Sequence, residues 1–127
     1  MIKQDYILRQ IELFGKGIAR LLGLDDSSVH PLDGIVREDG GVSAEQYLGF
    51  TLSAMVMEGR ICEAEDLLYE TVEAHPRPEY LGVAVAFYEM LANMSETDLQ
   101  KGNFSYAEIL DGMEGIRKIY EAQEGNG

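Results

Sequence analysis

Apolar residues recur every three or four positions through most of the chain, the spacing that places side chains on one face of a helix. The first such stripe lies within residues 1–22 and is followed by Gly23, a residue type that commonly ends helices. Its members are Ile7, Ile11, Phe14, Ile18 and Leu21. This pattern predicts an amphipathic N-terminal helix.

Residues 23–43 lose the periodicity and collect Asp, Ser, Pro and Gly, which favour turns. We therefore predict a loop over this segment. A connection of this length is unusual in a compact domain, where loops have a median of about five residues. Such a loop would also allow the N-terminal helix to reach a neighbouring molecule.

Two further helices are expected between Ser43 and Pro76. Ser43 and Gln46 have the spacing of a capping box, which predicts the start of a helix that ends at Gly59. A second helix is predicted from Ile61 to Ala74, because His75 and Pro76 follow and a proline disfavours the helical conformation of the residue before it. The apolar side of the first of these helices runs through Leu48, Leu52, Met55 and Val56.

The segment from Glu79 to Asn93 is apolar nearly all round, as expected of a central helix that is covered on several sides. Val83 and Val85 alternate with alanines and would also suit a strand, but the length of the run favours a helix. Ser95 then predicts a short helical turn ending at Gly102. The last helix is expected to reach residue 122 and to leave a frayed tail over 123–127. Its apolar stripe is Tyr106, Ile109, Met113, Ile116 and Tyr120.

Together these segments predict a single all-α domain over residues 1–127, built as an array of about five helices in hairpins with a flanking N-terminal helix. Gly59 is followed five residues later by Ala64, and Gly102 by Ala107, as when one helix ends and the next packs closely against it.

The stretch Ala44–Pro76 resembles one tetratricopeptide repeat. The resemblance rests on Gly59 at the interhelix turn, Ala64 at the small packing position, Leu68 at the large apolar position and Pro76 at the end. A second, partial copy is displaced by 43 residues, whereas the family repeats every 34 or so. The resemblance implies a right-handed array of hairpins that presents surfaces for binding rather than catalytic groups.

The whole chain also resembles a family of small uncharacterised proteins of Gram-positive bacteria. Their first helix begins with a Gln-Asp-Tyr-Ile motif, which is residues 4–7 here, followed by Arg9, Ile11 and Glu12. No activity comes with that family, so the resemblance bears only on fold and cellular source.

The formal net charge of −13 argues against nucleic-acid binding, because phosphate contacts require Lys or Arg. The charge is uneven, since residues 1–22 carry four basic and two acidic side chains. We expect this helix to lie against the acidic remainder of the chain. The alternative, a basic helix on an anionic membrane, is weaker because the helix has no Trp.

The sequence contains no recognisable catalytic, metal or cofactor site. The single cysteine, Cys62, fits a reducing cytoplasmic compartment, and no residue near it in sequence suggests a base that would activate it. Four carboxylates share one face of the helix 61–74 and predict a solvated surface, with docking of a basic partner as the alternative. They are Glu63, Asp66, Glu70 and Glu73.

We therefore expect a non-enzymatic module that binds a protein or peptide. In tetratricopeptide proteins the first helix of each repeat lines the binding groove, which here implies a face formed by Gln46, Ser53, Val56 and Met57. One alternative is a structural protein that dimerises through residues 1–22, with the following loop as a hinge. The other is a small enzyme with a site built from Glu residues.

Overall fold

The computed structural model describes residues 2–24 and 43–126, which form six α-helices and contain no strand. The predicted all-α class is therefore confirmed. The loop predicted over 23–43 lies outside the described residues except at its two ends. The helices are α1 (Gln4–Leu21), α2 (Ala44–Met57), α3 (Ile61–Ala74), α4 (Pro78–Ala92), α5 (Glu96–Lys101) and α6 (Tyr106–Asn126).

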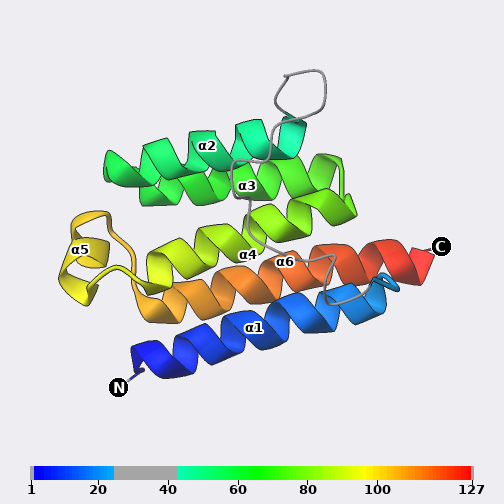
Figure 1. The fold of residues 1–127 in the computed structure, drawn as a ribbon, viewed down its shortest axis with the longest axis horizontal. Coiled ribbons are helices and arrows are strands. Elements are labelled where there is room, and N and C mark those ends of the chain that lie inside the picture. Colours follow the sequence, from blue (N-terminus) through cyan, green and yellow to red (C-terminus); the bar gives the residue numbers. More distant parts are fainter. Residues whose placement is uncertain (1, 25–42, 127) are drawn as a thin grey trace.

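The helices lie side by side in tiers (Figure 1). α2 and α3 form a hairpin at one side of the molecule, and α4 and α6 lie in the middle. α2 packs on α4 and α3 packs on α6, while α1 packs on both α4 and α6 from the opposite side. The first helix in the sequence thus covers the side of the α4–α6 pair that faces away from α2.

The predicted apolar stripe holds α1 on the rest of the molecule. Ile7, Ile11 and Ile18 are at most 1% exposed, and the ring of Phe14 meets that of Tyr88 edge-on. The side-chain amide of Gln4 also donates to the carbonyl of Ala92, at 2.9 Å. Leu21, which was expected on the same stripe, is 39% exposed. Two leucines at the helix end, 22 and 24, pack against the core instead.

Two helix starts were predicted from local hydrogen-bonding residues, and both are confirmed. The Ser43 hydroxyl accepts from the backbone N–H of Gln46, whose side chain accepts from the Ser43 N–H in return. Ser95 accepts from the N–H of Asp98 and opens the short helix α5, which brings the total above the five or so expected. α6 continues through Asn126 instead of fraying after residue 122, because the segment 121–124 consists of good helix formers.

The turns at Gly59 and Gly102 lie against each other, but they differ in backbone conformation. Gly59 has a φ of +82°, which lies in the left-handed region. Gly102 lies outside that region, and the left-handed residue of the second turn is Asn103. A Cβ at Gly102 would lie 3.2 Å from the Gly59 carbonyl oxygen and 2.6 Å from Cδ1 of Ile61. Gly102 is therefore required for close approach, and Gly59 for its backbone.

The two alanines that follow these turns also differ. Ala64 is completely buried, whereas Ala107 is exposed. The expectation that Ala107 marks a tight helix contact is therefore wrong. The start of α6 is anchored instead by the neighbouring aromatic residues Phe104 and Tyr106, both of which are buried.

Replacing Gly59 with alanine is expected to lower the free energy of unfolding by about 1 kcal/mol. No atom lies within 4 Å of the added Cβ, so the cost comes from the positive φ alone. Gly59→Asn should cost less, because asparagine tolerates the left-handed region. Urea denaturation measures both, and an alanine variant as stable as the wild type would contradict the conformational argument.

Candidate functional site

The four residues predicted to form a binding face lie on α2, but they do not share one surface. Gln46 and Val56 are each only 5% exposed, because both lie on the inward side of the helix. Gln46 serves the capping box described above. Ser53 is half-buried and lines a groove, whereas Met57 is 86% exposed. The sequence prediction therefore placed two of its four residues on a surface from which the fold removes them, because Gln46 and Val56 face the interior.

Ser53 lines a groove of about 230 Å³ between α2 and α4. Apart from the Ser53 hydroxyl, the side chains that line it are apolar. The α2 side contributes Phe50, and the α4 side contributes Val83, Ala86 and Met90. A groove of this composition suits an apolar side chain of a bound segment and offers one hydroxyl for a hydrogen bond.

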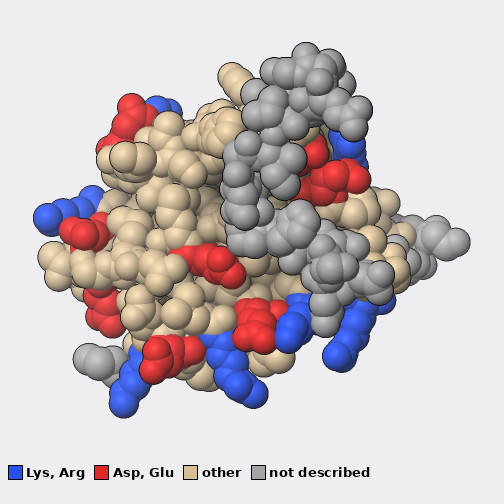
Figure 2. All heavy atoms as spheres, viewed as in Figure 1, with Lys and Arg blue, Asp and Glu red and all other residues tan. Residues whose placement is uncertain are grey.

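The outward side of α2 continues this apolar surface. Tyr47 is 70% exposed and Phe50 is 51% exposed, and with Met57 they form an outward row that also includes the exposed Ala54. We call these four residues the α2 stripe. Figure 2 shows tan surface over the part of α2 that is seen from this side.

A signal for this stripe is present in the sequence. From residue 46 to residue 57 the chain has no charged side chain, although 26% of all its residues are charged. A helix that is apolar all round is normally covered on all sides. Among the described helices, α2 packs mainly on α3 and α4.

A second, larger groove lies between α3 and α6, with a volume of about 600 Å³. The four carboxylates predicted to form a solvated face are all exposed, and three of them line this groove. The structure adds three carboxylates that periodicity on one helix does not reveal. The acidic lining consists of Glu65, Asp66, Glu70, Glu73, Glu108 and Asp111.

Glu65 is the point at which this groove is tied to the core. The Tyr88 hydroxyl on α4 donates to its Oε2 at 2.8 Å. Burial raises the pKa of the Glu65 carboxyl, and the hydrogen bond from Tyr88 opposes that shift. On the same helix, Tyr69 donates to the carbonyl of Gly112 at 2.5 Å, and its pKa is raised to about 12, mainly by burial. Glu65 is therefore a half-buried carboxylate engaged in structural bonding.

We expect Glu65→Gln to change the pH dependence of stability. The folded-state pKa of Glu65 is raised above its ordinary value of 4.5. Between pH 4.5 and the raised pKa, the folded protein therefore holds more protons than the unfolded chain. The free energy of unfolding then falls as the pH rises through that window. Glutamine keeps an acceptor for Tyr88 and removes the buried charge, so the variant should gain on the wild type as the pH rises above about 4.5.

Urea denaturation at a series of pH values measures this difference. The matched control is Glu70→Gln, which changes an exposed carboxylate on the same helix and should leave the shape of the profile unchanged. A Glu65→Gln profile parallel to that of the wild type would contradict the role assigned to burial.

Cys62 lies at the end of the acidic groove, where its Sγ is 3.6 Å from the carbonyl oxygen of Asn103. Burial, followed by the charge of Glu108, raises the pKa of its thiol. Because the thiolate is the nucleophilic form, this environment disfavours nucleophilic chemistry at neutral pH.

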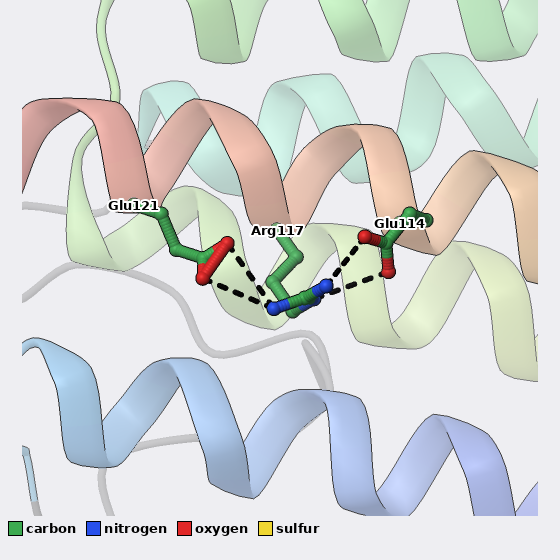
Figure 3. A network of polar contacts seen from close by, with 3 residues as sticks. All are labelled: Glu114, Arg117 and Glu121. Carbon is green, nitrogen blue, oxygen red and sulfur yellow. Dashed lines mark hydrogen bonds and ion pairs between the residues drawn. The ribbon is translucent and has the colours of Figure 1, made fainter.

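A basic side chain on α6 is compensated by its own helix. Figure 3 shows Arg117 between Glu114 and Glu121, one turn away on either side. Its Nη1 lies 3.0 Å from Glu121 Oε2, and its Nε lies 3.2 Å from Glu114 Oε2. All three side chains are 44–47% exposed, so solvent screens the ion pairs between them. This network is thus a surface feature of α6 rather than an anion site.

Two kinds of feature are absent from the part of the chain that the structure describes. Among residues 2–24 and 43–126, no three His, Cys, Asp or Glu side chains are grouped so that they could hold a metal ion. Within the same ranges no helix has the length and apolarity needed to cross a membrane.

Comparisons with known proteins identify a family. Neither the curated proteins nor the solved structures include a match to this chain. One family described only as being of unknown function matches residues 1–121, which is nearly the whole sequence. The chain therefore belongs to the family of unknown function DUF6483.

Proposed function

We propose that this protein is a non-enzymatic interaction module that binds a segment of another protein in the groove between α2 and α4. The observation that carries the proposal is the apolar lining of this groove beside a helix with no charge over residues 46–57. An exposed apolar patch on an otherwise acidic protein is typical of a binding site. Ser53 supplies the polar contact that would orient the bound segment.

A tetratricopeptide-like array forms part of this proposal. The stacking of α2 on α4 and of α3 on α6 supports it, because successive repeats pack first helix on first helix and second on second. The contact between Gly102 and Gly59 supports it as well. We further propose a cytoplasmic location in a Gram-positive bacterium, which fits the single free cysteine.

The two alternative functions have weaker support. Dimerisation by pairing of residues 1–22 would have to use the outer side of α1, because its inner stripe already packs on α4 and α6. Exchange of this helix between two copies would place the same stripe on the other copy. An enzyme with a carboxylate site would have to use the α3–α6 groove, where Glu65 is engaged with Tyr88 and the carboxylates predicted on α3 are exposed. Nucleic acid is disfavoured as a partner by the net charge of −13.

Affinity capture with matched variants tests the proposed function. Ser53→Arg places a long cation in the groove, and Ala107→Arg places the same side chain on an exposed position of α6. A genuine groove partner should be retained by the wild type and by Ala107→Arg and be depleted about tenfold or more with Ser53→Arg. Identical captured proteins with both variants would contradict a binding role for this groove.

A further inference from the structure

The α2 stripe has the spacing of a helix-pairing seam. Tyr47, Phe50, Ala54 and Met57 follow one another at intervals of three, four and three residues, which is the repeat by which two helices pack along their length. The inward side of the same helix is already occupied, with Leu48, Leu52 and Val56 at most 7% exposed. The stripe is thus additional to the side that α2 needs for its own fold.

The position of α2 in the stack leaves this seam open. α1 packs on the α4–α6 pair on the side that faces away from α2, and so closes one end of the stack. The α2–α3 hairpin forms the other end, where the aromatic side chains of the stripe are 51–70% exposed. Helical arrays normally cover both of their ends, because an internal repeat has apolar faces on two sides.

We propose that the α2 stripe pairs with the α2 stripe of a second copy of this chain, antiparallel across a twofold axis. In that arrangement the twofold axis passes beside position 52 of both helices. Each residue therefore faces the residue of the other copy that is equally many positions from 52 in the opposite direction. Phe50 then faces Ala54 of the other copy, so that a large side chain meets a small one. Tyr47 faces Met57, a pairing in which a thioether contacts an aromatic ring. A parallel arrangement would instead place Phe50 on Phe50 and Ala54 on Ala54.

Charge supports a second copy over a charged partner segment. The protein carries a net charge of −13, which opposes self-association through most of its surface. Residues 46–57 carry no charge, so pairing α2 with α2 brings no like charges together within the seam. A basic or acidic segment would find no ion pair there.

The area of the stripe sets the expected strength. With about 200 Å² for each fully exposed large side chain, the exposed parts of Tyr47, Phe50 and Met57 give roughly 400 Å² per copy. A symmetric contact therefore buries roughly 800 Å² from these side chains, which is below the roughly 1,200 Å² of stable interfaces and in the range of weak, transient contacts. We expect a dimer with a dissociation constant in the micromolar range.

This inference goes beyond the proposed function, because Phe50 is the one stripe residue that lines the α2–α4 groove and the other three lie outside it. Sedimentation equilibrium over a concentration series tests it on the full chain. The wild type should approach twice the chain mass of 14.1 kDa at several hundred micromolar. Tyr47→Glu/Met57→Glu should stay monomeric, while circular dichroism confirms that the fold is kept.

A charge-reversed variant then tests the orientation. Tyr47→Lys/Met57→Glu places opposite charges across the antiparallel seam and like charges across a parallel one. It should dimerise at least about tenfold more tightly than Tyr47→Glu/Met57→Glu. A monomeric wild type at several hundred micromolar would overturn the inference, as would a dimer that survives the double Glu variant. Either result leaves the groove proposal standing, because Ser53 lines the groove whereas Tyr47 and Met57 do not.

Discussion

Gly112→Ala is expected to lower the free energy of unfolding by about 2–3 kcal/mol. The added Cβ would lie 2.2 Å from Oε2 of Glu65 and 2.4 Å from the hydroxyl oxygen of Tyr88. Those two atoms form the hydrogen bond that joins α3 to α4, and α6 reaches that bond only because residue 112 has no side chain. Thermal or urea denaturation measures the loss. The clash should outweigh the gain of about 1 kcal/mol that replacing a glycine with alanine otherwise brings to a helix.

Gly17→Ala is the matched control for this prediction. It is also a glycine within a helix, but no atom lies within 4 Å of its added Cβ. This variant should therefore be more stable than the wild type, by up to about 1 kcal/mol. A Tyr88→Phe background removes the hydroxyl contact and frees the Glu65 carboxylate from its hydrogen bond, so that it can move aside. Gly112→Ala should therefore cost at least about 1 kcal/mol less there. A Gly112→Ala protein that gains stability like Gly17→Ala would refute the packing argument.

The helices were predictable because their determinants are local. The capping box at Ser43 needs only Gln46, three residues away, and the stripe of α1 repeats within its own turns. The proline-free apolar run of 79–93 likewise predicted α4, which is buried along most of its length. In each case the signal lies within the span of one helix, where spacing alone determines which residues share a face.

The candidate surfaces were predictable only in part, because they depend on which helices are neighbours. The sequence pointed to α2, but whether Gln46 and Val56 face a groove or the core depends on where α3 and α4 lie around it. Tyr88 likewise contacts Glu65 across 23 positions, a separation at which periodicity carries no information. The charge-free run of 46–57 was visible, yet its meaning required the knowledge that α2 lies at the edge.

The repeated step from Gly59 to Ala64 and from Gly102 to Ala107 illustrates the same limit, because equal spacing does not imply equal surroundings. The two glycines touch, since the turns before α3 and α6 are neighbours. The alanines do not correspond, because Ala64 faces the core with no exposed surface whereas Ala107 faces solvent. The register of α6 is set by its own buried aromatic residues rather than by the glycine that precedes it.

This difference leads to the second large effect. Ala64→Leu adds three carbon atoms at a completely buried position and is expected to cost about 2–3 kcal/mol, because the core must shift to accommodate them. Ala107→Leu makes the same change at an exposed position and should stay within about 0.5 kcal/mol of the wild type. Urea denaturation of both proteins measures the contrast. Equal losses would mean that the two turns are equivalent after all, as the sequence alone suggests, and would contradict the different burial of the two alanines.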